Sequence, residues 1–432
     1  MEREDIFMTR PRLTPSDSLF PVLKLLRADG PITRTELAHR TGLTRKVVSL
    51  RVEELIASGF AEEGDVARST GGRAPREVRF RTQDAHLLVA ELAATSITVG
   101  LTDLGGTVLT ESHVTVDPIA GPDTTLDRVE ELFDQLLTDR PAGSPPVFGI
   151  GIGIPGPVTI ATGRPVGALS VPAWADYPVR DRLAARFDLP VWVNNDANLM
   201  ALGELRAGLA RGHQDVLFIK IGRGIGGAII SNGTLNLGAE GYAGEFGHVV
   251  IDDDVNETCW CGRTGCLTQI AGARALRLKG QHAATDGSSP ILAAIMTQGR
   301  DIGAREVFTA AAAGDPTSTQ ILTHAGHQLG AVTSVLVSGL NPSLVLIDAG
   351  LVSNNDPFMT AFQAAVRERS MPNSTSHLQF AISQLGNSAG LIGAAHMVVD
   401  ELLSPRHLGT WSEQGTPAGL ANLIHNNAAP AA

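Results

Sequence analysis

Cysteine is scarce in this 432-residue chain, and the three that occur, Cys259, Cys261 and Cys266, fall within eight residues of one another. A disulfide framework would spread its cysteines along the chain, so this pattern excludes one. Long apolar runs are also lacking, and no segment approaches the roughly 18 apolar residues of a membrane span. The first residues, Met1 to Asp5, lack the basic and apolar regions of a signal peptide. We therefore expect a cytoplasmic protein without a membrane partner.

An overall excess of positive charge is absent too. The net charge of −11 argues against a protein that coats nucleic acid, but the charge is unevenly distributed. Residues 1–80 hold 14 basic and 12 acidic side chains, whereas the remaining residues hold 20 and 33. A mildly basic module on an acidic body is compatible with DNA binding by that module alone. The length of the chain predicts two or three domains.

The first eighty residues have the pattern of a winged helix-turn-helix, which we assign to residues 1–82. Apolar residues at helical spacing predict a helix over about 18–28, a second helix capped by Thr33 or Thr35, and a third over about 44–58. Two strands follow at 60–63 and 77–80, and the Gly-rich segment 69–73 between them predicts a wing.

The third helix has one core face and one face suited to a major groove. Its core face carries Val48, Val52, Leu55 and Ile56. Basic and hydroxyl groups reach phosphates and base edges, aliphatic groups touch thymine methyls, and an arginine at a wing tip enters a minor groove. The residues expected to contact double-stranded DNA are Thr44, Arg45, Lys46, Val47, Ser49, Leu50, Arg51 and Arg73. The alternative is a helical adaptor whose basic side chains are only solvated.

An α/β body follows the winged helix. Strands are predicted at 87–93, 97–102 and 108–116, then a helix at 125–137 and a buried strand at 148–154. This order resembles the two-lobed actin-like, ribonuclease-H-like fold of sugar kinases. We assign residues 83–405 to it and expect a disordered tail over residues 406–432, whose end is rich in asparagine and alanine.

The cysteine cluster predicts a metal site. His248 precedes Cys259, Cys261 and Cys266, and the glycines between them let the chain curl around one ion. Three thiolates and an imidazole form a closed tetrahedral site for structural zinc, with no open position for catalysis. The alternative is three free cysteines in a loop.

Taken together in order, the motifs resemble those of the ROK family (repressors, open reading frames and sugar kinases), in particular its regulators. The resemblance extends from about residue 18 to residue 397. Beside the winged helix and the cysteine cluster, it rests on segments 151–157, 195–198, 202–204, 224–227, 244–248 and 340–342.

The resemblance implies a set of sugar-contacting residues: Ser170, Asn195, Asp196, Glu245 and His248. Asp196 matches the general base that deprotonates the attacking hydroxyl in the kinases, so here it is interpreted as a vestigial base. His248 would bind zinc and face the sugar as well, so that the metal holds the ligand loop in shape. The alternative is that these residues only cap and stabilise the site.

Several departures from the kinase pattern concern the nucleotide. Residues 103–107 match a DxGGT phosphate loop but fall between the wrong strands, which favours an ordinary hairpin turn. The homologous segment 91–95 has alanines in place of both glycines, and their β-carbons would crowd a phosphate. The second phosphate loop contains Arg223, and the adenosine-side segment reads Asp348-Ala349-Gly350. Two other departures concern the sugar: Ser170 replaces the family's usual asparagine, and Thr268 replaces an acidic residue.

The sequence therefore predicts a non-enzymatic transcription regulator, a repressor of carbohydrate genes, that responds to a sugar or sugar phosphate. Its partners would be a DNA operator and a second copy of the chain, in a homodimer or homotetramer. One alternative is an active sugar kinase with a DNA-binding arm. Another is a ligand-independent scaffold whose body only dimerises the DNA-binding arms.

Overall fold

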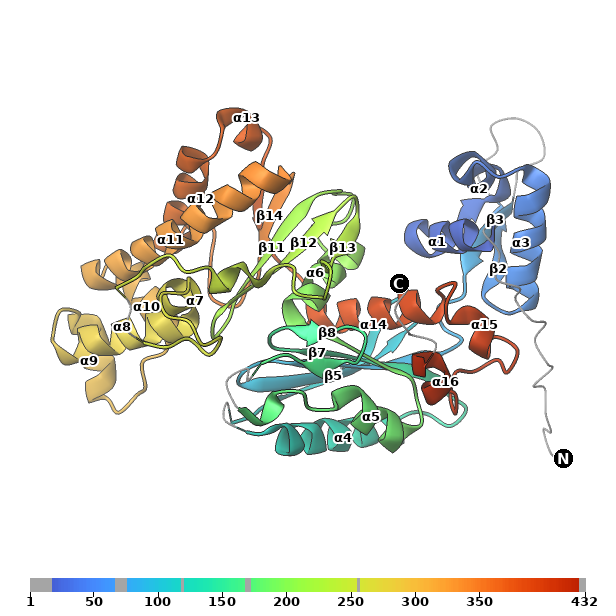
Figure 1. Ribbon diagram of the computed structural model, residues 1–432, viewed down its shortest axis with the longest axis horizontal. Helices are drawn as coiled ribbons and strands as arrows, with labels where there is room; N and C mark the ends of the chain where they lie inside the picture. Colours follow the sequence, from blue (N-terminus) through green and yellow to red (C-terminus); the bar gives the residue numbers. More distant parts are fainter. Residues whose placement is uncertain (1–17, 67–75, 118–119, 168–171, 255–256, 427–432) are drawn as a thin grey trace.

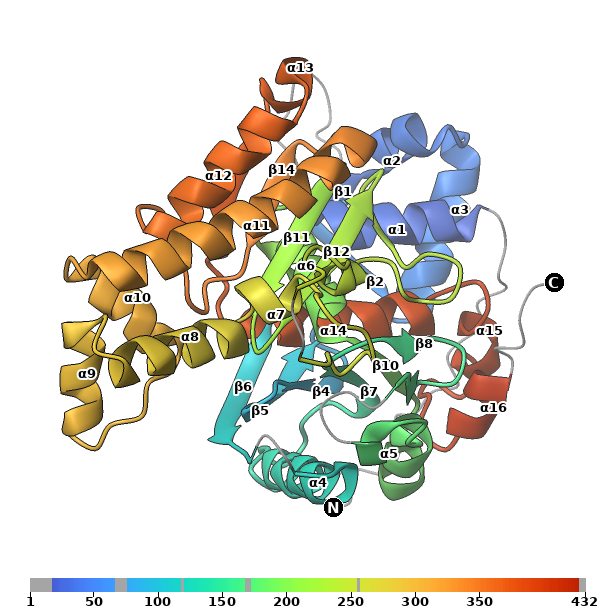
Figure 2. The same ribbon diagram turned by 60° about the vertical axis from the view of Figure 1, so that its left-hand side comes forward.

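The computed structural model describes residues 18–66, 76–117, 120–167, 172–254 and 257–426. A winged helix lies at one end in Figure 1, and two lobes follow, each built on a five-stranded sheet. Helices α6 (Asp196–Ala207) and α14 (Ser388–Leu402) pack against each other, and they lie between the two sheets in both Figure 1 and Figure 2. No helix within the described ranges is long and apolar enough to cross a membrane.

The predicted winged helix-turn-helix is confirmed. It contains α1 (Leu19–Asp29), α2 (Arg34–Thr41) and α3 (Arg45–Ala57), with a small antiparallel sheet of β1 (Ile32–Thr33), β3 (Arg76–Phe80) and β2 (Ala61–Val66). The α2 helix begins where the Thr33 hydroxyl accepts the Glu36 N–H at 3.2 Å, so Thr33 is the cap. Gly42, with φ of 69°, makes the left-handed turn that ends α2.

Lobe I has the predicted order of three strands, a helix and a strand. Its sheet has the order β10-β7-β4-β5-β6. Alternate residues of β4 join opposite cores: Leu88 and Ala90 join the core of α4 and α5, and Leu87 and Val89 join the core of α14. Its elements are β4 (His86–Leu92), β5 (Ser96–Asp103), β6 (Val108–Thr115), α4 (Pro122–Thr138), β7 (Val147–Ile154), β8 (Val158–Thr159), β9 (Arg164–Pro165), η1 (Pro172–Trp174), α5 (Val179–Phe187) and β10 (Val191–Asn195).

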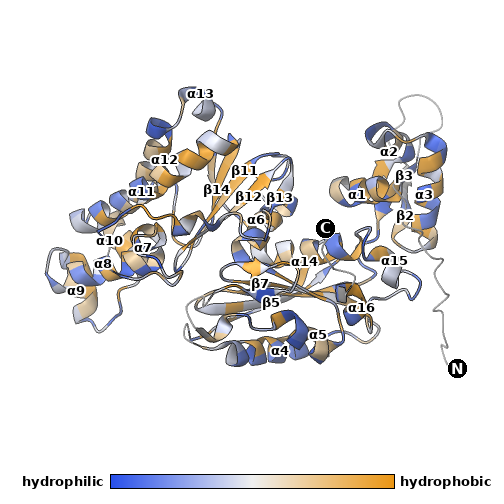
Figure 3. Ribbon diagram, in the orientation of Figure 1, coloured by the Kyte–Doolittle hydropathy of each residue, from blue (hydrophilic) through white to orange (hydrophobic). Residues whose placement is uncertain are grey.

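Lobe II is built around a sheet of order β13-β12-β11-β14-β15. Leu217 and Ile219 of β11 join the core of the outer helices, whereas Phe218 packs on the side of α6, so this strand is apolar on both faces and is drawn mostly in orange in Figure 3. The elements are β11 (Val216–Ile221), β12 (Ile225–Ser231), β13 (Thr234–Asn236), η2 (Glu245–His248), α7 (Thr268–Ala271), α8 (Ala273–Thr285), α9 (Pro290–Thr297), α10 (Ala304–Ala312), α11 (Pro316–Leu340), β14 (Leu344–Ile347), α12 (Pro357–Arg369), α13 (Pro372–Thr375) and β15 (Gln379–Ile382).

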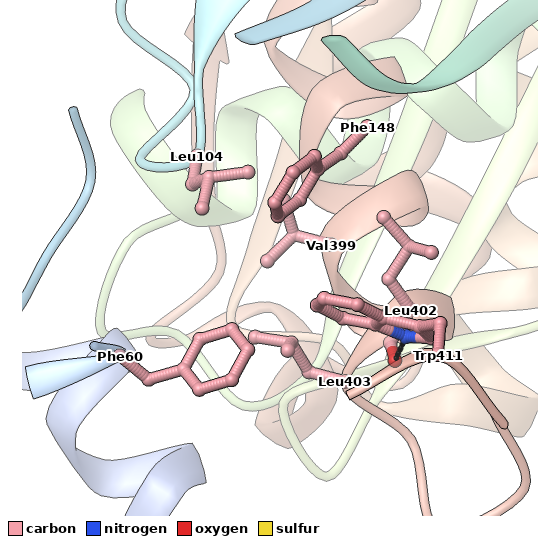
Figure 4. A pocket seen from close by; sticks show the side chains of 7 residues that line it. All are labelled: Phe60, Leu104, Phe148, Val399, Leu402, Leu403 and Trp411. Carbon is pink, nitrogen blue, oxygen red and sulfur yellow. Dashed lines mark hydrogen bonds between the residues drawn. The ribbon is translucent and has the colours of Figure 1, made fainter. Parts of the chain in front are cut away.

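The expectation of a disordered tail from residue 406 is wrong as far as residue 426. This segment forms α15 (Leu408–Trp411) and α16 (Ala421–Asn426), while residues 427–432 lie outside the described ranges. Trp411 is 1% exposed and meets Phe60 of the winged helix and Phe148 of β7 edge-on, with ring centroids 5.6 and 5.3 Å apart (Figure 4). The segment is ordered because one large ring fills the junction between two domains, a contact that leaves no periodic pattern in the sequence.

Candidate functional site

The structure places the predicted ligand residues at the junction of the two lobes. Asn195 ends β10 and Asp196 begins α6, while Glu245 and His248 lie in η2 of lobe II. Burial, followed by the negative charge of nearby Asp196, raises the pKa of Glu245 to about 7. These four residues are thus brought together, whereas Ser170 falls in the segment 168–171, outside the described residues.

Asn195 and Asp196 make hydrogen bonds within the protein. The Asn195 carbonyl oxygen Oδ1 accepts the Asn198 N–H at 3.1 Å and caps α6, while its Nδ2 donates to the Gly156 carbonyl at 3.0 Å. The Asp196 Oδ1 accepts its neighbour's N–H, from Ala197, at 2.8 Å. Asn195 therefore stabilises the site, as the structural alternative expected, and one of its amide hydrogens is still available to a ligand.

A largely buried lysine lies at this junction. Lys220, on β11, donates to Asp196 Oδ2 at 2.8 Å and to Glu91 Oε1 at 3.1 Å. Its side chain is 15% exposed, and the two acceptors belong to β4 and α6. Although burial acts in the opposite direction, the carboxylates of Asp196 and Glu91 raise the pKa of Lys220, so the ammonium keeps its proton.

A third carboxyl group, that of Asp348, lies near this ammonium. Asp348 follows β14, and its side chain accepts the N–H of Ile221 at 2.6 Å and that of Gly350 at 3.3 Å. Burial raises the pKa values of both Glu91 and Asp348. The fixed cation at the centre is therefore Lys220, which joins Asp196 to Glu91, the first residue of the segment that the resemblance assigns to phosphate binding. The only sequence signal for it is a charged residue within the apolar strand 216–221.

The segments that the resemblance assigns to phosphate binding are tight turns in this chain. Residues 93–95 form the turn between β4 and β5, where Ala93 N–H donates to the Ser96 carbonyl at 2.8 Å. The Thr268 hydroxyl accepts the Ile225 N–H of the second loop at 2.9 Å, and it is buried there. Thr268 thus stabilises this loop from a position where a carboxylate was expected.

The predicted hairpin turn at residues 103–107 is confirmed. It joins β5 to β6, and the Asp103 carboxylate accepts the N–H groups of Gly105 and Thr107 at 2.9 and 2.8 Å. The aspartate of this apparent phosphate motif is therefore used to close the turn.

The metal-site residues converge. The ligand atoms of His248, Cys259, Cys261 and Cys266 all lie within 4.8 Å of one another. Cys259 Sγ is 3.5 Å from His248 Nδ1, and Cys261 Sγ is 3.6 Å from Cys266 Sγ. Ligand atoms around tetrahedral zinc are about 3.3–3.8 Å apart, given Zn–S bonds near 2.3 Å. The donor set and its spacing therefore fit one zinc ion after a small contraction.

His248 connects this cluster to the predicted ligand site. Its Nδ1 faces Cys259, whereas its Nε2 lies 4.0 Å from Glu245 Oε2. Trp260 packs edge-on against the imidazole, with ring centroids 4.4 Å apart. Both nitrogens of one ring are thus oriented, the first toward the thiols and the second toward a residue of the ligand site.

The third helix of the winged helix presents the expected surface. Val48, Val52 and Leu55 are fully buried, while Leu50 is 49% exposed and Thr44, Arg45 and Lys46 are exposed beside it. Val47 and Ser49 are half-buried on the same side, and Arg73 lies outside the described residues. Arg51 differs from the other predicted DNA contacts, because its guanidinium donates hydrogen bonds within the domain, to Ser18 and to the Glu54 carboxylate.

Comparison with known proteins gives separate matches for the two-lobed region and for the winged helix. A model described as ROK family matches residues 89–401, and one described as winged helix-turn-helix DNA-binding matches residues 19–62. The chain belongs to the ROK family. The first match spans both lobes, and the second covers the three helices of the DNA-binding domain and the start of β2.

This ROK protein resembles both kinases and regulators. A glucokinase of Halalkalibacterium halodurans is 29% identical over 308 residues, which cover 71% of this chain and 93% of the relative. The xylose repressor of Bacillus spizizenii is 25% identical over 382 residues, 88% of this chain and 94% of the relative. A crystal structure of a ROK family transcriptional regulator, homologous to the Escherichia coli MLC protein, matches with a TM-score of 0.74 at 25% identity, over 94% of this chain and 98% of that one. The repressor match extends into the winged helix, because only 350 residues follow residue 82.

Proposed function

We propose that this ROK protein is a DNA-binding transcription repressor of carbohydrate genes, whose kinase-like body binds a sugar or sugar phosphate without phosphorylating it. The observation that carries the proposal is the pairing of Lys220 with Asp196, in a chain that also has a winged helix. In the kinases this carboxylate deprotonates the attacking hydroxyl; in this chain one of its oxygens accepts a hydrogen bond from a fixed ammonium. The xylose repressor and the glucokinase among its relatives support a pentose or a hexose as the effector.

The proposed mechanism is a change in DNA affinity on effector binding. A sugar hydroxyl would donate to Asp196 or Glu245, and the His248 imidazole would lie against the ring. Such a ligand changes operator affinity only if it binds the DNA-competent and DNA-incompetent conformations differently. Two copies of the chain would place their α3 helices about 34 Å apart, on the two halves of a palindromic operator.

An active sugar kinase with a DNA-binding arm is the second candidate, favoured by the retained Asp196 and by the glucokinase relative. Calorimetric titration with ATP and an assay of sugar-dependent ATP hydrolysis separate the two. We expect neither tight ATP binding nor hydrolysis with xylose, glucose or N-acetylglucosamine. Hydrolysis that the wild type performs and Asp196→Asn loses would establish the kinase instead.

The effector is tested with DNA that the protein itself selects from a random duplex pool. Fluorescence anisotropy then measures operator affinity with and without xylose, glucose, N-acetylglucosamine and their phosphates, and thermal shift measures binding of each to the protein. We expect at least one of them to stabilise the protein and weaken operator binding. If none stabilises it while the operator is still bound, the ligand-independent scaffold is correct.

We also propose that His248, Cys259, Cys261 and Cys266 hold structural zinc. Such an ion would supply no reaction chemistry, since all four positions around it are protein ligands. Elemental analysis should find about one zinc per chain in the wild type and none in Cys261→Ala, with a lower unfolding midpoint in that variant. Thr264→Ala, in the same loop but without a ligand atom, should retain the metal. A wild type purified without chelator that holds no zinc would contradict the assignment.

A further inference from the structure

A single carboxylate joins the winged helix to the helix that begins at the ligand site. Asp400, near the end of α14, accepts hydrogen bonds from Arg27 of α1 at 2.5 Å and from Arg206 of α6 at 3.1 Å. The exposed fractions of these side chains are 37%, 15% and 29%. Although burial opposes ionisation, the two guanidinium groups lower the pKa of Asp400, so both bonds are charge-assisted.

Helices α6 and α14 are in direct backbone contact. A Cβ added to Gly203 of α6 would lie 2.0 Å from the Ala389 carbonyl oxygen, and one added to Gly393 of α14 would lie 1.8 Å from the Leu199 carbonyl oxygen. No side chain can stand between the helices at these points. A displacement of one therefore displaces the other, because close-packed backbones transmit movement rather than absorb it.

This helix pair reaches both functional ends of the molecule. At one end, Asp196 begins α6, and Gly390 of α14 lies so close to the Glu91 carboxylate that an added Cβ would be 1.9 Å from its Oε2. At the other end, Leu402 and Leu403 line the junction with Phe60 and Trp411 in Figure 4. The two acceptors of Lys220 thus adjoin the beginnings of the two helices, and the DNA-binding domain adjoins the end of α14.

We propose that α6 and α14 move as one unit that couples the ligand site to the winged helix, and that Asp400 is its contact with α1. The inference rests on the proposed function, since it assigns the regulation of the same site. A ligand that binds Asp196 and alters its bond to Lys220 would shift the start of α6. The shift would reach α14 through its backbone contact with α6, and α1 through the charge-assisted bond of Asp400 to Arg27, while Arg206 orients the Asp400 carboxylate from α6.

The coupling can be tested without any effector by hydrogen exchange of the full-length protein. Arg206 bonds to Asp400 of α14 rather than to α1, yet Arg206→Met should accelerate amide exchange in residues 19–29 about tenfold. Arg27→Met should accelerate exchange at the start of α6. Arg206→Lys should restore most of the protection. The matched control is Arg186→Met, which removes an ion pair of the same kind, to Asp134, at a site in lobe I away from this path. Unchanged exchange in α1 on replacing Arg206 would overturn the proposal.

A second measurement distinguishes this inference from the effector assignment. The same exchange experiment is repeated with saturating xylose, glucose and N-acetylglucosamine. A sugar that protects residues 195–198 should also change exchange in α1 of the wild type, but not of Arg27→Met, which cuts the bond between Asp400 and α1. If no sugar protects that segment, the proposed effector class fails while the coupling seen without effector stands. A sugar that protects the segment and alters α1 equally in both proteins would refute the role of Asp400.

Discussion

Trp411 provides the most direct test of the ordered C-terminal segment. Its ring is 1% exposed, and its Nε1 donates to the Leu402 carbonyl at 2.9 Å. The ring also contacts Phe60 of the winged helix and Phe148 of lobe I. A cavity of about 10 Å³ already adjoins it, lined by seven apolar side chains, so the site has little freedom to collapse around a missing ring. Replacing a buried tryptophan by alanine costs about 3–5 kcal/mol, and the lost ring contacts and hydrogen bond place the cost of Trp411→Ala at about 5 kcal/mol.

Urea unfolding of the full chain, followed by far-ultraviolet circular dichroism, measures this loss. The free energy of unfolding falls by roughly 2 kcal/mol per molar urea, so the midpoint of the transition that includes the winged helix should fall by about 2.5 M. Trp411→Phe, which keeps a ring but loses the N–H, should cost about 2 kcal/mol. Trp260→Ala is the matched control, because that ring is 39% exposed and its loss should cost under about 1 kcal/mol. If Trp411→Ala is no more destabilised than Trp260→Ala, the segment does not hold the two domains together.

Three further predictions concern pH, helix packing and DNA. Burial lowers the pKa of His396 to about 4 and of His425 to about 3, whereas an unfolded histidine titrates near about 6.5, so their contribution is complete above about pH 6.5. As the pH falls from 6.5 to 4, the free energy of unfolding should drop by about 1.4 kcal/mol per pH unit for each histidine. The urea midpoints at pH 7 and pH 5 should therefore differ less in the variant with glutamine at both positions than in the wild type. Gly203→Ala should cost about 3 kcal/mol in thermal or urea unfolding because its Cβ meets the Ala389 carbonyl, whereas Gly339→Ala in α11, with open space around it, should stabilise slightly. Lys46→Ala and Arg73→Ala should each weaken binding to the selected operator about tenfold in anisotropy titrations with an unchanged unfolding midpoint; equal affinity in both would remove α3 and the wing from the interface.

The sequence by itself determined the local elements and the residue types of the sites. Apolar spacing and capping residues specify the winged helix, since α3 needs only a threonine cap and a 3.6-residue core stripe. The strand-rich start of lobe I and the clustered His248, Cys259, Cys261 and Cys266 are likewise visible, because periodicity and ligand spacing are properties of nearby residues. The family motifs added the order of the lobes and the positions of Asn195, Asp196 and Glu245.

Only the tertiary structure decided what these residues touch. Lys220 lies 129 residues from Glu91, and Asp400 lies 373 residues from Arg27, so no local pattern indicates that either pair forms a bond. The same is true of Trp411, which is buried because two surfaces distant in sequence meet around it. The three clustered cysteines excluded a disulfide framework and indicated the metal site. The contacts among the C-terminal segment, the winged helix and the ligand site come instead from long-range packing. Contacts of this kind depend on the packing of whole domains, which single residues in a linear sequence do not specify.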